Sequence, residues 1–109
     1  MYPPQNYDIM HKRQVDDGIG GYVEDWAVLK SVEGYLDLLQ GSDLNNAQNA
    51  FIEDSTHVLV IPQYTTDITD GMRVLASDNK FYEITYADNP ANVNHHNELF
   101  CKFGGVWRG

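Results

Sequence analysis

The sequence predicts a mainly β fold, a small antiparallel barrel or sandwich with one long inserted loop that holds a short helix. Three observations support this class. Short segments rich in β-branched and aromatic residues recur along the chain, turn signals separate these segments at close spacing, and one polar stretch with helical periodicity interrupts them. With 109 residues, we expect a single domain, residues 1–109, with one small core and an inserted segment at about residues 36–54.

Two strands joined by a hairpin turn are predicted at the start of the chain. The first strand covers residues 7–14, and the second covers residues 22–32, where Trp26 and Val28 share one parity. Between them, three glycines within residues 18–21 favour a tight reversal, because glycine adopts positive φ without steric cost. Trp26 is expected in the core, with an exposed position in an interface as the alternative, since tryptophan is favoured in both places.

The pattern changes in the middle of the chain. Leucines come close together until Gly41, after which Ser42 or Asp43 can begin a short helix with Leu44 and Phe51 on one side. This stretch holds apolar side chains that a small barrel cannot easily bury, together with flexible and acidic residues. It is a long insertion for so small a β domain, and insertions of this kind tend to be functional.

We interpret this inserted segment as an assembly or channel loop. A mixture of apolar, acidic and flexible residues suits a segment that is loosely held in the monomer and becomes ordered against neighbouring subunits. The alternative is a helix folded back over one open end of the barrel. The candidate residues of the loop are Leu36, Leu38, Leu39, Asp43, Leu44, Phe51, Ile52, Glu53 and Asp54.

The second half of the chain shows a more regular β pattern. Strands are predicted over residues 56–63, 72–77 and 81–86 and around the alternating residues Leu99, Cys101 and Phe103. Asp78-Asn79 is a signal for a two-residue hairpin loop, since both residues tolerate positive φ. Tyr82, Ile84 and Tyr86 are expected on one side of their strand.

A core and one contact between subunits can also be predicted. Neighbours in a strand alternate, so Met72 is expected to face inward and Arg73 outward. An outward Arg73 is a candidate to pair with acids of the next subunit, and a local surface ion pair is the alternative. The predicted core residues are Trp26, Val28, Val60, Met72, Val74, Ile84 and Leu99.

Composition limits the possible functions. Sixteen acids face seven bases, a formal net charge of -9, which argues against a DNA-gripping module because phosphate binding rests on clustered lysine and arginine. An acidic wall instead suits a channel through which DNA must slide. The N-terminus lacks the features of a signal peptide, and the longest apolar runs are too short to span a bilayer, so no membrane association is expected.

No catalytic or metal site is expected. The histidines and the single cysteine, which do not follow a zinc-binding spacing, are His11, His57, His95, His96 and Cys101. Cys101 lies in an apolar strand, where cysteine is usually a small hydrophobic residue and not a nucleophile. We therefore expect a non-enzymatic protein without cofactors.

The order of motifs along the chain resembles the phage head closure, or head–tail joining, family. A glycine-rich turn precedes a strand with tryptophan. Four strands follow: an apolar one, one with Gly-Met-Arg, one with Tyr-x-Ile and one with cysteine. The motifs are Asp17-Gly18 through Gly21 before Trp26-Ala27-Val28, then His57-Val58-Leu59-Val60-Ile61, Gly71-Met72-Arg73-Val74, Phe81-Tyr82-Glu83-Ile84, and Asn89-Pro90 through Glu98-Leu99-Phe100-Cys101. The resemblance covers about residues 7–105.

This resemblance implies a structural protein of the virion. Such a protein would form a homo-oligomeric ring in the neck, close the DNA-filled head and join it to the tail, with a portal or adaptor protein above and a tail terminator or tail protein below. Viral DNA would pass through the channel without sequence-specific binding, and the neck would assemble in the cytoplasm of the host bacterium. The alternatives are another neck or tail structural protein, such as a tail terminator or adaptor, and a free ligand-binding barrel.

Overall fold

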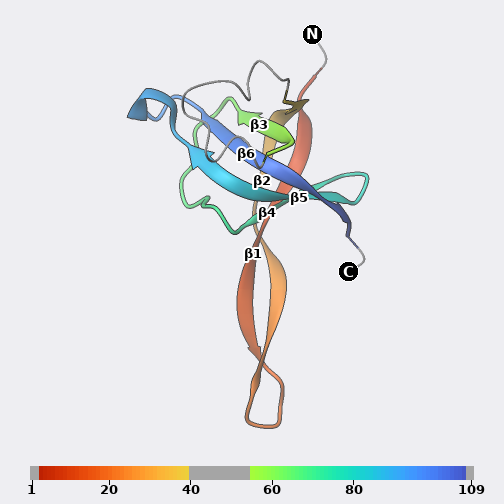
Figure 1. Ribbon diagram of the computed structural model, residues 1–109. Helices are drawn as coiled ribbons and strands as arrows, with labels where there is room; N and C mark the ends of the chain where they lie inside the picture. Colours follow the sequence, from red (N-terminus) through yellow and green to blue (C-terminus); the bar gives the residue numbers. More distant parts are fainter. Residues whose placement is uncertain (1–2, 40–54, 108–109) are drawn as a thin grey trace.

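The computed structural model describes residues 3–39 and 55–107, and these residues form a mainly β structure (Figure 1). The strands of the described part are β1 (Gln5–Asp16), β2 (Tyr22–Leu38), β3 (His57–Ile61), β4 (Arg73–Ala76), β5 (Lys80–Asp88) and β6 (Asn97–Val106), with one 3-10 turn, η1 (Pro90–Asn92), before β6. Each strand pairs antiparallel with its neighbours. The predicted mainly β, antiparallel class is therefore confirmed.

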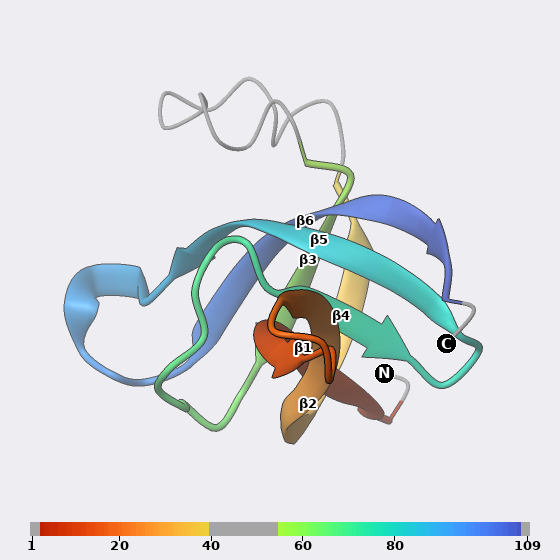
Figure 2. The same cartoon turned by 90° about the horizontal axis from the view of Figure 1, so that it is seen from below.

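The sheet closes on itself in the order β1-β2-β3-β6-β5-β4. Closure depends on β4, which pairs with β5 on one side and with residues 7–10 of β1 on the other. Figure 2, viewed from below, shows β5 and β6 forming an arch beside the β1–β2 hairpin, whose loop end points toward the viewer. The closed sheet surrounds the core and is called the barrel below.

The first hairpin extends far beyond the barrel (Figure 1). Strands β1 and β2 have 12 and 17 residues. Only residues 7–10 of β1 pair with β4, and only residues 35–38 of β2 pair with β3. Residues 11–27 pair with each other alone in the described part of the chain, and we call this two-stranded segment the arm. Because of the arm, the molecule measures 51 × 30 × 28 Å.

The core lies inside the barrel. Its buried residues are Tyr7, Ile9, Leu59, Ile61, Ile68, Val74, Tyr82, Ile84, Leu99 and Cys101. The predicted core positions of Val74, Ile84 and Leu99 are thus confirmed, and Met72 is partly buried against the same cluster. Because alternate residues of β4 face inward, Arg73 lies on the outside, as expected.

Three predicted core residues lie elsewhere. Val60 is only half-buried, because its neighbours Leu59 and Ile61 are the residues of β3 whose side chains face the core. Val28 is 53% exposed, and Trp26 is half-buried outside the core cluster. Trp26 lies in the arm, beyond the part of β1 that pairs with β4. A register shift also changes which side chains of β2 face inward: Ile9 pairs with Lys30 but Met10 pairs with Val28, so the intervening Leu29 has no partner and the alternation reverses.

A second register shift changes the end of β5. Ile84 pairs with Cys101 and Tyr86 with Phe100, which leaves Thr85 as the extra residue. Tyr82 and Ile84 are buried, whereas Tyr86 turns outward and stacks on Phe100 at 6.1 Å between ring centroids. The prediction that Tyr82, Ile84 and Tyr86 share one side is therefore wrong for Tyr86.

The hairpin between β4 and β5 follows the predicted sequence signal with one more residue in its loop. Leu75 pairs with Phe81, so the loop contains Ser77, Asp78 and Asn79. Asn79 has φ 67°, and its N–H donates to the carbonyl of Ala76 at 3.0 Å. A three-residue loop that ends in a left-handed residue is a common hairpin geometry.

The inserted segment begins later than predicted. Leu36 lies within β2, pairs with Leu59 and packs against the core, so it belongs to the barrel wall. Leu38 ends β2 and is 63% exposed, and the N–H of Leu39 donates to the carbonyl of Thr56 at 2.9 Å. The predicted short helix and the other loop candidates lie outside the described residues: Asp43, Leu44, Phe51, Ile52, Glu53 and Asp54.

Candidate functional site

An arginine surrounded by aromatic rings lies where the arm meets the barrel. The guanidinium carbon of Arg73 is 4.1 Å from the ring centroid of Trp26, 4.6 Å from that of Phe81 and 5.6 Å from that of Trp107. The two tryptophan rings meet edge to face at 6.3 Å, and Phe81 meets Trp107 in the same way at 5.6 Å. We call these four residues the Arg73 cluster. It joins β2, β4, β5 and the residue after β6.

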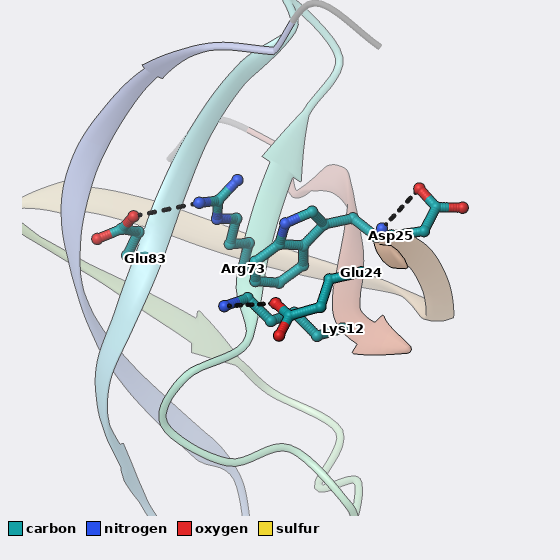
Figure 3. Close-up of polar contacts among 6 residues, drawn as sticks. Lys12, Glu24, Asp25, Arg73 and Glu83 are labelled. Atoms are coloured by element: carbon teal, nitrogen blue, oxygen red, sulfur yellow. Dashed lines mark hydrogen bonds and ion pairs between the residues drawn. The ribbon is translucent and has the colours of Figure 1, made fainter. Parts of the chain in front are cut away.

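Arg73 also makes an ion pair within the chain. Its Nη2 lies 3.4 Å from Oε1 of Glu83, the residue opposite it on β5, as Figure 3 shows. The Arg73 side chain is only 22% exposed, and its Nε is buried with no hydrogen-bond partner among the described residues. The structure thus contains the local ion pair that was the alternative for Arg73. A contact of Arg73 with a second subunit stays a prediction.

A glycine makes room for one ring of the cluster. A Cβ placed on Gly104 would lie 2.3 Å from the Phe81 ring, far inside the contact distance. The Phe81 ring can therefore occupy this position beside β6 only because residue 104 has no side chain. This explains the glycine at position 104 inside a strand that continues to Val106, whereas Gly105 has φ 136°, a conformation that favours glycine.

Cross-strand ion pairs hold the middle of the arm. Lys12 Nζ lies 3.3 Å from Glu24 Oε2, a pair shown in Figure 3, and Arg13 Nη2 lies 3.4 Å from Asp25 Oδ2. Lys12 also lies 5.6 Å from the ring centroid of Trp26. All four charged side chains are more than half exposed, so each pair contributes little to stability but favours this strand register.

The end of the arm is a hydrogen-bonded turn, as the glycines predicted. The Asp17 carboxylate accepts hydrogen bonds from the N–H groups of Ile19 and Gly21 at 2.9 and 3.0 Å, and Asp16 accepts one from Gly18 at 2.8 Å. Gly18 and Gly20 have φ of 83° and 90°, values that favour glycine. We call residues 15–23 the tip.

The tip exposes large apolar side chains. Ile19 is 89% exposed, Tyr22 71% and Val23 51%. Sequence reasoning treated these residues only as parts of a turn and a strand. Two features of the sequence could have identified them: Tyr22 and Val23 are adjacent apolar residues that must face opposite sides, and they directly follow an acidic turn.

A second group of rings includes Tyr82, the core neighbour of Phe81 on β5. The His57 ring lies 4.9 Å from that of Tyr82, which lies 5.6 Å from Phe103. Burial lowers the pKa of His57, and it raises the pKa of Tyr82 together with the charge of Asp78. The Thr56 hydroxyl lies 2.8 Å from His57 Nδ1 and accepts the N–H of Phe103 at 2.9 Å. These contacts fix the barrel next to the start of β3.

The described residues offer no evident reaction centre. Burial raises the pKa of the Cys101 thiol to about 12, so this group stays protonated and packs as a core residue. In residues 3–39 and 55–107, no three side chains of His, Cys, Asp or Glu are grouped so that they could hold a metal. The same ranges contain no helix with the length and apolar character needed to cross a membrane.

A pocket of about 540 Å³ lies beside the barrel, between β2 and the segment after β3. Lys30, the base that lines it, donates hydrogen bonds to Thr65 Oγ1 at 2.8 Å and to the carbonyl of Thr66 at 2.6 Å. The interior of the barrel is filled by fully buried side chains such as Leu59, Val74 and Leu99. A ligand of the kind held inside larger barrels therefore has no place at the barrel centre.

A comparison with protein families matches residues 4–104 to the phage head completion proteins. The chain belongs to this family. The resemblance to head closure proteins drawn from the motifs is thereby confirmed. Membership of the phage head completion protein family indicates that the protein has a structural role connected with the phage head and is a component of the virion.

A solved structure shows the same fold. The solution structure of protein SF1141 from Shigella flexneri 2a matches with a TM-score of 0.72 and 17% sequence identity, over 94% of this chain and 93% of that chain. At this identity the likeness concerns the fold alone. The comparison with curated proteins found no match.

Proposed function

We propose that this head completion protein forms a ring at the head–tail interface, where it closes the DNA-filled head and joins it to the tail. The family match over residues 4–104 carries this proposal. In this role the barrel would form the wall of the ring, with a portal or adaptor protein above it and a tail terminator or tail protein below it. The protein would act without catalysis, in the neck of a virion assembled in the host cytoplasm.

The charge of the chain supports a place around a DNA channel. The net charge is -9, and four of the bases in the described residues are engaged in ion pairs within the chain: Lys12, Arg13, Arg73 and Lys80. Such a surface offers little positive charge to phosphate groups, so DNA could slide past it without being held. The wall of a channel requires this property.

The shape of the molecule supports a connecting role. The barrel has a small filled core, while the arm carries an exposed apolar tip away from it. Exposed apolar groups on a projecting element are typical of surfaces that bind other proteins. A free ligand-binding barrel would have no need of such an arm.

A phage that lacks the gene for this protein tests the proposal. We expect lysates with complete tails and with filled heads that lose DNA and remain unattached, and purified protein should restore infectious particles when it is added. Electron microscopy of the necks of wild-type particles should show the protein as a ring. Tails of abnormal length in the mutant would instead identify a tail terminator. Empty heads with tails attached would contradict a role in closing the head.

A further inference from the structure

We propose that the tip of the arm docks into an apolar pocket with a basic rim on a different protein of the particle, and not onto a second copy of this chain. The inference rests on the proposed neck function. It starts from the exposure of Ile19, Tyr22 and Val23, which folding of the chain leaves in water. An isolated two-stranded hairpin is marginal in water, so an apolar end on such a hairpin needs a reason outside the fold.

The register of the arm determines the shape of the docking element. Asp16 is opposite Tyr22, and Val15 is opposite Val23. Residues opposite each other share a face and adjacent pairs alternate, so Tyr22 and Val23 lie on different faces of the hairpin. With Ile19 at the very end, the tip is apolar on both faces. Such an element fits a pocket that surrounds it better than it fits a flat surface.

The negative charge of the tip indicates that the rim of the partner's pocket is basic. Residues 15–23 contain two acids, Asp16 and Asp17, and no base. The nearest bases in the arm, Lys12 and Arg13, already pair with Glu24 and Asp25. The carboxylates of the tip bind backbone N–H groups of the turn but have no cation beside them in the described structure. A partner with lysine or arginine around its pocket would complement them.

A second copy of the chain is a poor match for this requirement. Four of its described bases are in ion pairs, and Lys30 donates to two threonine oxygens. Lys102 is the exposed base for which the described part of the chain gives no ion pair, and it lies opposite Glu83 in the sheet. The acidic tip would therefore find few unpaired bases on the described surface of a second copy. The charge balance therefore favours a basic partner of another kind.

The test uses two purified particle parts as probes: heads made without this protein, which need not retain their DNA, and free tails. The variants are Ile19→Ser combined with Tyr22→Ser, and Asp16→Asn, which removes a charge but keeps an acceptor for the Gly18 N–H. Val93→Ser is the matched control, because Val93 is 65% exposed and lies on the loop before β6, far along the chain from the tip. Binding is measured by co-sedimentation at several salt concentrations, and folding by thermal melting.

We expect the double variant to keep its melting temperature and to lose binding to heads or to tails by on the order of tenfold or more. Asp16→Asn should weaken the same binding by a smaller factor and reduce its dependence on salt. Val93→Ser should bind as the wild type does. Unchanged binding of the double variant to both parts would overturn the docking proposal while leaving the neck function intact.

Two other results are equally decisive. If the double variant loses self-association in light scattering, the occupant is a second copy and the proposal is wrong. If the wild-type protein binds neither heads nor tails, the neck function itself fails, and the docking proposal fails with it.

Discussion

The guanidinium of Arg73 lies over the ring of Trp26, 4.1 Å from its centroid, and this contact links β4 of the barrel to the arm. Trp26 lies in the arm, one residue before Ala27, which pairs with His11 at the end of the arm nearest the barrel. The contact therefore acts at the root of a hairpin that pairs with no other strand among the described residues. The direction in which the arm points should depend on this residue pair.

The first prediction concerns Arg73. Replacing it with alanine removes the cation beside three aromatic rings and the ion pair with Glu83, and should lower the free energy of unfolding by about 1–3 kcal/mol. Arg13→Ala is the control, because its ion pair is exposed and should contribute only about 0–1 kcal/mol. Urea unfolding measures both. Equal losses would mean that the aromatic rings add nothing to the ion pair.

The second prediction compares Trp26 with Leu99. Trp26 is half-buried at the surface, so Trp26→Ala should cost about 1–3 kcal/mol. Leu99 is fully buried, so Leu99→Ala should leave a cavity and cost about 2–5 kcal/mol. Denaturant unfolding of both variants checks the order. A larger loss at Trp26 would show that the Arg73 cluster stabilises the barrel more than this part of the core does.

The third prediction concerns the inserted segment. We predict fast amide hydrogen exchange across residues 40–54 in the isolated subunit and strong protection in the assembled neck. Leu36 should already be protected in the isolated subunit, since it belongs to β2 and pairs with Leu59. Mass spectrometry of the free and assembled protein provides the measurement. Strong protection of residues 40–54 in both states would identify the segment as a lid over its own barrel.

The fourth prediction concerns the ionisation of Cys101. Its pKa is raised by burial from 9.0 to about 12, so the folded protein keeps the proton where the unfolded chain loses it. The stabilising effect is complete below pH 9 and disappears as the pH rises from 9 to 12. Stability should therefore fall in this range more steeply for the wild type than for Cys101→Ala. At pH 8, a thiol reagent should react with Cys101 only after denaturant is added.

The slopes of stability against pH decide this prediction. Lysines and tyrosines also titrate in the alkaline range, and comparison with Cys101→Ala removes their contribution. Equal slopes, or rapid labelling of the native protein, would contradict the burial of the thiol.

Simple alternation predicted most of the barrel correctly. It located the described strands within a few residues, except for the end of β2, and put Val74, Ile84 and Leu99 in the core. The side of a strand that faces inward is strongly enforced where one face is buried. Alternation failed at Val28 and Tyr86. In both strands one extra residue, Leu29 or Thr85, reverses the parity, and no residue type in those positions announces a bulge.

Other features depended on contacts that a single sequence does not reveal. Val60 lies in the continuous apolar run Val58 to Ile61, where either parity looks equally good. The pairing of Leu36 with Leu59 extends β2 into what looked like the insertion. The Arg73 cluster unites residues from four separate parts of the chain, so only the closed sheet brings them together.

The place of β6 between β3 and β5 affects how the chain can fold during synthesis. As β6 follows all the other described strands in the sequence, the sheet cannot close until residue 106 has left the ribosome. Before that, β3 and β5 each have an edge of unpaired backbone groups that can attract other chains. The β1–β2 hairpin is local and can form early, but the β1–β4 and β3–β6 pairings must wait for contacts between distant residues. A nascent chain cut short within β6 should therefore aggregate and not yield a smaller folded domain.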